Sequence, residues 1–279
     1  MHVVPRIAML RTALITVAAI VLASMGVLAF DRGAAPSSLL GSVLGGIGPF
    51  STGPCPRGMV RVEFSGGPFC IDQFEASVGE GCPLRRPSLM QDTAINLSTP
   101  GCVPQSVRGR EPWTYVSQLQ AREACAKAGK RLPTPEEWFA AALGTPEEAC
   151  VVKEQGGTKK TGKAASCTSS FEAQDMVGNV WEWVDAVVRG GVYGGVTLPR
   201  SGYVAEANEK GIPLSSLPRK EGDAYGGDRV WTDRTKVAGV MRGGFYRSGD
   251  AAGIYAFHAA SPPTFVGDAI GFRCVRAVE

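Results

Sequence analysis

Histidine is almost missing from this 279-residue chain, which contains only His2 and His258. Since His2 lies in the N-terminal segment, the rest of the chain cannot build a metal site from two or three histidines. A Ser–His–Asp triad would have to be centred on His258. The chain also lacks a GxSxG elbow, a P-loop and a GxGxxG before a helix. These absences exclude several common enzyme classes, and His258 is better explained as a packed or surface residue than as a base.

Charge of one sign is not concentrated anywhere. The 29 Lys and Arg residues and 26 Asp and Glu residues are scattered and give a formal net charge of +3. No basic run indicates a nucleic-acid partner. The 36 Gly and 19 Pro residues predict a loop-rich fold.

The first thirty residues form a separate segment. Arg6 and Arg11 precede a largely apolar run over residues 12–30, which is long enough to span a bilayer. Val27 and Ala29 would also suit the −3 and −1 positions of a cleavage site. We therefore leave open a cleaved signal peptide or a retained N-terminal membrane anchor over residues 1–30. Both predict an exported domain that is periplasmic, secreted or anchored facing outward, with membrane contact only through this segment.

Residues 31–54 are rich in Gly, Ser and Pro and are typical of a linker, so the folded domain is expected over residues 55–279. Eight cysteines suit an oxidising compartment, and no CxxC occurs among them. The sequence does not determine their pairing. Cys82 with Cys102 and Cys150 with Cys167 would each close a local polar loop, whereas Cys125 fits a buried free thiol equally well.

Two helices are predicted in the middle of the chain. Ser117 and Gln120 form a capping box before residues 118–128, and Gly129 follows as a C-cap. Thr134, with Glu137 three residues later, begins a second helix that ends before Gly144.

Short strands are predicted over residues 59–64, 68–77, 240–249 and 269–278. Residues 79–112 are expected to be mostly loop, and residues 190–231 a long irregular excursion. This order of elements indicates an α+β fold.

The segment "DMVGNVWEWV" (175–184) concentrates acidic and aromatic side chains around Gly178. Asp175 and Glu182 are hard oxygen ligands of the kind that calcium accepts. In a strand, Trp181 and Trp183 would share one face, and Glu182 would lie between valines on the other. A carboxylate buried there needs a partner, so the residues alone permit either a metal site or a buried polar network.

Four segments, taken in order, resemble the formylglycine-generating enzyme family, also called sulfatase-modifying factors. They are "MVRVEFSGGPFCIDQFEAS", "RLPTPEEWFAAA", "DMVGNVWEWV" and "MRGGFYRSG…IGFRCVR". The resemblance implies an α+β fold related to C-type lectins, with low secondary-structure content, two helices and short antiparallel sheets. It also implies calcium bound by the side chains of Asp175 and Glu182 and the carbonyls of Gly178 and Val180.

Active members of this family oxidise a substrate cysteine with copper held by two thiolates, and the matching positions here are Ser248 and Gly253. Neither suits copper(I), so copper is not expected. Cys274 matches a family disulfide cysteine, but its usual partner position holds Ala142. The resemblance therefore leaves Cys274 to pair elsewhere, with Cys150 as one option.

The resulting hypothesis is an exported, non-catalytic, calcium-stabilised binding module at the cell envelope, with an unknown protein or glycan ligand. Its expected surface combines residues 190–231 with aromatic and cationic side chains, namely Arg242, Tyr246, Arg247, Tyr255, Phe257 and Phe265. The alternatives are an oxidase of the formylglycine-generating type acting on a sulfatase cysteine through a rearranged site, and an envelope scaffold protein.

Overall fold

The computed structural model describes residues 55–222 and 224–278, which form a mixed α+β domain of low helix content. The α-helices described are α2 (Met90–Ser98), α3 (Gln118–Lys127) and α4 (Pro135–Ala142). The predicted signal or anchor segment and the linker lie outside these residues. Within the described part, none of the helices has the length and apolar character needed to cross a membrane.

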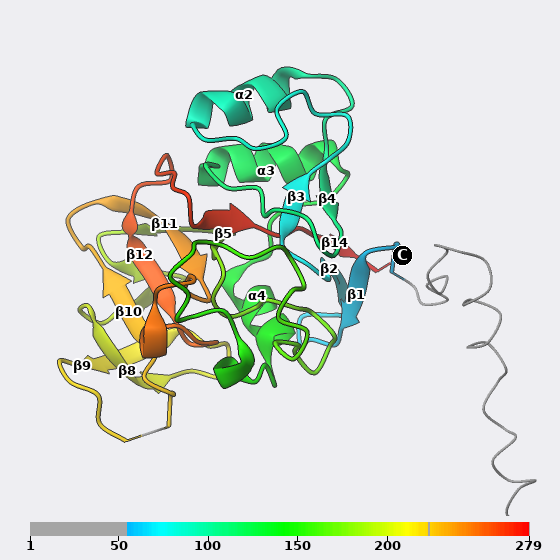
Figure 1. Ribbon diagram of the computed structural model, residues 1–279. Helices are drawn as coiled ribbons and strands as arrows, with labels where there is room; N and C mark the ends of the chain where they lie inside the picture. The colour runs from blue at the N-terminus through cyan, green and yellow to red at the C-terminus, as the bar shows by residue number, and fades with distance from the viewer. Residues whose placement is uncertain (1–54, 223, 279) are drawn as a thin grey trace, which may run out of the picture. The chain divides into compact units, whose positions relative to one another are not determined.

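Most strands belong to one nine-stranded sheet, on the left and centre of Figure 1. Its order is β7 (Val196–Thr197), β6 (Val192–Tyr193), β5 (Trp181–Arg189), β11 (Val237–Arg242), β12 (Phe257–Ser261), β10 (Arg229–Thr232), β8 (Gly202–Ala207) and β9 (Pro213–Leu217), while β13 (Ile270–Phe272) pairs with β5. The pairs are antiparallel except β10 with β12 and β13 with β5, which are parallel.

Two smaller sheets complete the domain. One has the order β1 (Met59–Val62), β2 (Phe69–Asp72) and β14 (Val275–Ala277), and the other pairs β3 (Ala76–Val78) with β4 (Pro104–Ser106). Short 3-10 helices lie at η2 (Glu147–Ala149) and η3 (Gly249–Ala251). Because β2 pairs with β14, the beginning and end of the described domain lie side by side (Figure 1).

Both predicted helix starts are confirmed. Ser117 accepts a hydrogen bond from the Gln120 amide, and the Gln120 side chain accepts one from the Ser117 amide. Thr134 and Glu137 form the same reciprocal pair at the start of α4. These local bonds satisfy amides that have no partner inside the helix, which explains why short-range sequence patterns located both starts.

Residues 79–112 are mostly loop, as predicted, although they also contain α2 and β4. The prediction of an irregular excursion over residues 190–231 was wrong, because this range contains the strands β6 to β9 and most of β10. The α2 helix is short, flanked by prolines and capped by Asp92, whose carboxylate accepts bonds from the amides of Ser88 and Leu89. The strands of the second segment are stabilised mainly by pairing with neighbouring strands, as in β6 with β7 and β8 with β9, and β10 also pairs with the more distant β12.

The described cysteines form four disulfides and none is free, which is consistent with an extracellular or periplasmic protein. Cys82 pairs with Cys102 and Cys150 with Cys167, the two local pairs that the sequence favoured. Cys274 pairs with Cys125, so neither a free Cys125 nor a Cys150–Cys274 bond is correct. The Cys125 side chain faces the core, where β13 and β14 bring Cys274, and no local pattern reveals that meeting.

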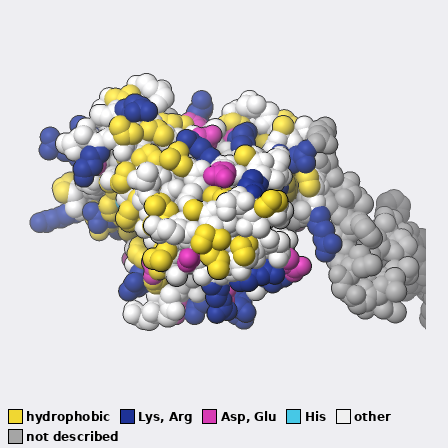
Figure 2. Space-filling view, turned by 90° about the horizontal axis from the view of Figure 1, so that it is seen from above, with side chains coloured by type: hydrophobic (Ala, Val, Ile, Leu, Met, Phe, Trp, Pro, Cys, Tyr) yellow, Lys and Arg dark blue, Asp and Glu magenta, His cyan; other side chains and the backbone are white. Residues whose placement is uncertain are grey.

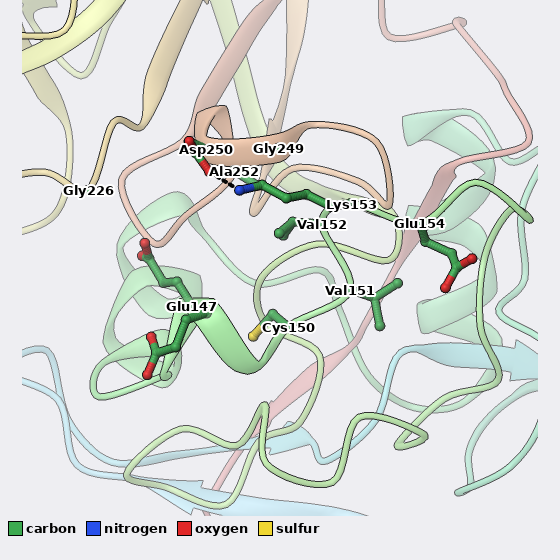
Figure 3. Close-up of a pocket in the computed structure, with 11 residues that line it drawn as sticks. Glu147, Cys150, Val151, Val152, Lys153, Glu154, Gly226, Gly249, Asp250 and Ala252 are labelled. Carbon is green, nitrogen blue, oxygen red and sulfur yellow. Dashed lines mark ion pairs between the residues drawn. The ribbon is translucent and has the colours of Figure 1, made fainter.

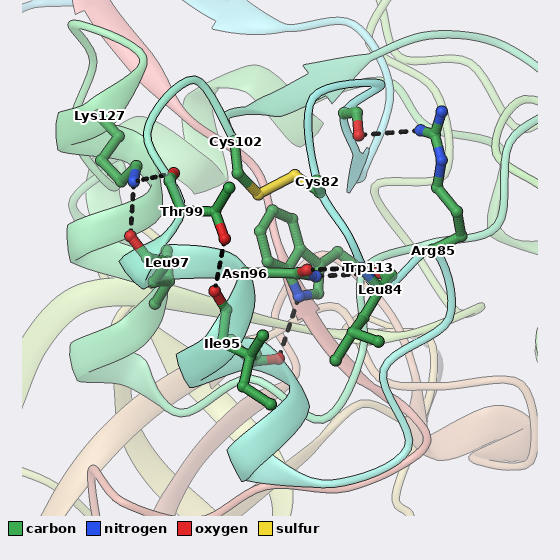
Figure 4. Close-up of a disulfide and its surroundings, with 12 residues drawn as sticks. Cys82, Leu84, Arg85, Ile95, Asn96, Leu97, Thr99, Cys102, Trp113 and Lys127 are labelled. Atoms are coloured by element: carbon green, nitrogen blue, oxygen red, sulfur yellow. Dashed lines mark hydrogen bonds between the residues drawn. A yellow bond between two sulfur atoms is a disulfide. The ribbon is translucent and has the colours of Figure 1, made fainter.

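The Cys82–Cys102 bond closes the segment that holds α2, as Figure 4 shows. Asn96 on α2 accepts a bond from the Leu84 amide at 2.9 Å and donates to the Leu84 carbonyl at 2.8 Å. The Trp113 indole donates to Thr93 at 3.1 Å. Exposed Leu89, Met90, Ile95 and Leu119 lie on or beside α2 and α3. On the face seen from above in Figure 2, hydrophobic side chains alternate with Lys and Arg.

The Cys125–Cys274 bond should contribute the most stability of the four, because its partners are 149 residues apart. Replacing both cysteines by alanine should lower the free energy of unfolding by about 4–5 kcal/mol, against about 3 kcal/mol for the Cys82–Cys102 pair. Urea unfolding of the two double variants compares them directly. Equal losses of unfolding free energy in the two double variants would contradict the larger contribution expected from the longer loop.

Candidate functional site

Glu182 lies at the centre of the domain, on strand β5 and only 1% exposed. As predicted, it occupies the face of β5 opposite Trp181 and Trp183, which pack in a separate core cluster. Its carboxylate accepts bonds from the Arg273 guanidinium at 2.6 and 2.7 Å, and from the Trp138 indole nitrogen at 2.7 Å. The carboxylate therefore forms a buried, charge-assisted network.

Arg273 connects this network to the rest of the fold. Its side chain is fully buried and donates to the backbone carbonyls of Asp72 at 3.0 Å and Gln174 at 2.8 Å. The guanidinium thus joins β2, β5 and the segment before the motif at one point. Of the two interpretations left open by the sequence, the structure shows the buried polar network.

Two further carboxylates lie near the ion pair. Glu75 is fully buried; its Oε2 accepts from the Asn179 side chain at 2.6 Å, and its Oε1 has no hydrogen-bond partner. Burial, together with the charges of Asp175 and Glu182, raises its pKa well above the ordinary value. Burial also raises the pKa of Asp175 to about 6, although its Oδ2 accepts a bond from the Gly162 amide.

The residues expected to bind calcium do not fit that ion as they are placed. The Glu182 oxygens are taken by Arg273 and Trp138, and a cation at the carboxylate would meet the guanidinium. Across residues 55–222 and 224–278, no group of three His, Cys, Asp or Glu side chains is arranged to hold a metal. Calcium at Asp175, Gly178, Val180 and Glu182 stays a prediction of the resemblance. In the structure, the counter-charge of the Glu182 carboxylate is the Arg273 guanidinium.

The positions that would carry the thiols lie after β11. Ser248 accepts a hydrogen bond from the Phe245 amide, and Gly253 follows η3. The carboxylate of Asp228, which is 1% exposed, fills the space beside Gly253, so that a Cβ on residue 253 would overlap it. A side chain at residue 253, the second position that the resemblance assigns to a thiol, would therefore require the Asp228 carboxylate to move.

A cleft of about 560 Å³ opens beside these positions (Figure 3). Its walls come from η2 with the following residues 150–154, from η3 and from Gly226. Glu147 on η2 points toward the wall formed by residues 226–254, and its Oε1 accepts a bond from the Ile254 amide at 2.8 Å. Four carboxylates, those of Glu147, Glu148, Glu154 and Asp250, line this concave surface.

Three of the six residues named for the expected binding surface lie inside the protein. Arg242 and Phe257 are fully buried and Tyr246 is 4% exposed, so these three are corrected to core residues. The Arg242 guanidinium packs against the rings of Trp138 and Phe257 and donates to backbone carbonyls. Tyr255 is half-buried, whereas Arg247 and Phe265 are exposed.

Comparison with known proteins agrees with this architecture. A family model described as "Sulfatase-modifying factor enzyme 1-like domain" matches residues 61–278. The chain belongs to this family. Hercynine oxygenase from Mycolicibacterium smegmatis is 28% identical over 102 residues, which cover 30% of this chain and 24% of that protein. The chain therefore matches about a quarter of that relative's length.

Two solved structures are similar to this chain at low sequence identity. The Major Tropism Determinant U1 variant gives a TM-score of 0.47 at 21% identity, covering 80% of this chain and 53% of that one. CarF gives a TM-score of 0.39 at 17% identity, covering 81% and 96%.

Several residues of the site were not found from the sequence. Arg273, Asp228, Glu147 and Glu75 stand in segments whose local pattern shows nothing unusual. For Arg273 there was an indirect signal, because the buried position of Glu182 required a partner. Asp228 offered none, since it follows two glycines in a segment interpreted as loop.

His258 packs between the rings of Trp181 and Trp231, with centroids 5.6 and 5.9 Å away. This agrees with a packed residue rather than a base. Burial lowers its pKa from 6.5 to about 4.

The buried ion pair should dominate the stability of the centre. Glu182→Gln keeps an acceptor for Trp138 but leaves Arg273 buried without a counter-charge, and should cost about 3–5 kcal/mol. We expect the double variant Glu182→Gln/Arg273→Met to lose less than the sum of the two single losses. Urea unfolding measures the three free energies, with and without calcium. If calcium stabilised the wild type but not Glu182→Gln, then Arg273 would not be the only cation that the Glu182 carboxylate binds.

His258 should make stability pH-dependent. Its folded-state pKa lies below its unfolded value, so the unfolded chain binds the proton more tightly, and stability falls as the pH drops from about 6.5 to about 4. The loss attributable to this residue should reach about 2–3 kcal/mol. His258→Phe keeps an aromatic ring and should remove that part of the pH dependence. Identical pH profiles for the two proteins, measured by urea unfolding, would show that His258 is not responsible.

Proposed function

We propose that this domain is an exported, non-catalytic binding module, in which the reaction site expected from the family has become a ligand cleft. The observation that carries the proposal is the pairing of Gly253 with Asp228. One position lacks a side chain, and a buried carboxylate occupies the space that a thiol there would need.

The chemistry of the remaining groups supports the same conclusion. Copper(I) prefers soft thiolate ligands, whereas Ser248 and Asp228 offer hard oxygens. All eight cysteines of the described domain are bonded in pairs, so they supply no thiolate for a rearranged copper site. The single described histidine, His258, packs against tryptophans instead of a reactive group.

The concave surface beside these positions suits binding. Its volume of about 560 Å³ lies within the range of small-molecule sites, about 300–1,000 Å³. Disulfide Cys150–Cys167 fixes one wall, since Cys150 lines the cleft. A rigid wall lowers the entropy cost of ordering a ligand. Calcium has no part in this proposal, because the Glu182–Arg273 pair holds the centre.

Incubation of the full chain with copper and a cysteine-containing sulfatase peptide tests the absence of catalysis. We expect the cysteine to remain unmodified, as read by mass spectrometry of the peptide. Conversion of the cysteine to an aldehyde would overturn the proposal and restore the oxidase alternative.

A double variant tests whether the missing thiols alone explain the expected lack of oxidase activity. Ser248→Cys/Gly253→Cys restores both sulfur positions, yet it should remain inactive and less stable, because the new side chain at 253 overlaps Asp228. Ser248→Cys alone is the matched control and should fold normally. Copper-dependent oxidation by the double variant would show that Asp228 does not block the site.

A further inference from the structure

The cleft bounded by residues 147–154, Gly226 and residues 249–252 is called the acidic cleft below. Its charged lining residues are Glu147, Glu148, Lys153, Glu154 and Asp250, four carboxylates and one ammonium group. Figure 3 shows the Lys153 ammonium directed at Asp250, with Glu147 on the opposite side. The lining is therefore strongly negative in a domain whose chain carries a small positive net charge.

Lysine side chains at the edges of this cleft already contact some of its acceptor groups. Lys153 pairs with Asp250 at 2.6 Å, and Lys159 pairs with Glu154 at 2.9 Å. Lys220 donates to the Gly226 carbonyl at 3.1 Å. The Glu147 carboxylate, in contrast, accepts from a backbone amide on one oxygen only. Glu147 on the inner wall thus keeps negative charge that the lysines at these edges do not pair with.

A buried acceptor without a hydrogen-bond partner lies behind this inner wall, next to Gly226. Asp228 Oδ2 accepts from the Tyr255 amide at 2.7 Å, whereas Asp228 Oδ1 has no hydrogen-bond partner. A Cβ on Gly226, which lines the cleft, would lie 3.6 Å from that oxygen and 2.9 Å from Glu147 Oε2. The two carboxylates therefore flank the same glycine, at the end of the cleft away from Lys153.

This arrangement has an energetic cost that a ligand would relieve. An unsatisfied buried acceptor destabilises the fold, and more so where it is charged. Burial, followed by the charge of Glu147, raises the pKa of Asp228 well above its usual range. Burial also raises the pKa of Glu147. A positive group with N–H donors would supply both the missing hydrogen bond and the counter-charge.

The remaining lining indicates what such a group is attached to. Val151, Val152 and Ala252 contribute apolar surface between the acidic side chains. A hydrocarbon stem can lie along such a surface while its charged end reaches the carboxylates. A bare metal ion fits less well, because the described residues contain no group of three metal-ligating side chains of the His, Cys, Asp or Glu type.

We propose that the acidic cleft binds an organic cation that combines a hydrocarbon stem with an N–H-donating head, as in a lysine side chain or a free alkylamine. Its head contacts Glu147 and Asp228, and its stem lies along Val151 and Val152. The inference rests on the proposed function, because it names the ligand chemistry of the same cleft.

Titration calorimetry of the full chain tests this with three probes. N-acetyl-lysine-N-methylamide and n-butylamine carry the ammonium head, and N-acetyl-norleucine-N-methylamide has a comparable stem without charge. We expect at least one ammonium probe to bind about tenfold more tightly than the norleucine probe. Binding of butylamine alone would identify a free amine as the source, whereas binding of the lysine probe alone would identify a polypeptide. Failure of both, or equal binding of the norleucine probe, overturns the inference.

Charge-neutral variants locate the site. Asp228→Asn and Glu147→Gln should each weaken binding about tenfold, while Glu209→Gln, which removes an exposed carboxylate outside the cleft, should leave it unchanged. If Asp228→Asn does not fold, Glu147→Gln decides alone, because Glu147 is partly exposed. Unchanged affinity in Glu147→Gln overturns the assignment. If the amines do not bind and the cysteine peptide stays unmodified in the copper incubation, only the inference about the ligand is refuted. If the peptide's cysteine is oxidised, the proposed non-catalytic function is refuted.

Discussion

The ion pair between Glu182 and Arg273 is the constraint on which the centre of this domain depends. Two fully desolvated charges tolerate each other only with close geometry and satisfied remaining donors. Trp138 supplies a further donor to Glu182, and backbone carbonyls accept from Arg273. Trp138 comes from α4, Glu182 from β5 and Arg273 from the residues just after β13, and one of the carbonyls belongs to β2. The ion pair therefore fixes how these separate parts of the chain meet.

Local physics explains which parts of the fold were predictable. The capping boxes at Ser117 and Thr134, and the alternation that separates Glu182 from its neighbouring tryptophans, depend on residues within a few positions. Arg273 stands 91 residues from Glu182, and Cys274 stands 149 residues from Cys125. Only the assembled sheets bring such residues together. The need for a partner was therefore visible in the sequence, whereas the identity of the partner was not.

In the candidate site, too, the sequence did not reveal which residues are buried. Arg242 and Phe257 were expected on a surface because aromatic and cationic residues often bind ligands, yet both are fully buried. In Arg242 the guanidinium lies against aromatic rings, which compensates part of its desolvation. Conversely, Asp228 lies among glycines typical of turns, and β8 and β12 enclose it only through pairing with β10. Residue type alone could not separate these two outcomes.

Gly253 and Asp228 are physically coupled, and that coupling connects fold to function. Because a Cβ at residue 253 would overlap the Asp228 carboxylate, a side chain there and this carboxylate in its present position exclude each other. A thiolate site would serve a soft metal, whereas a buried, partly unsatisfied carboxylate serves a hydrogen-bond donor that carries positive charge.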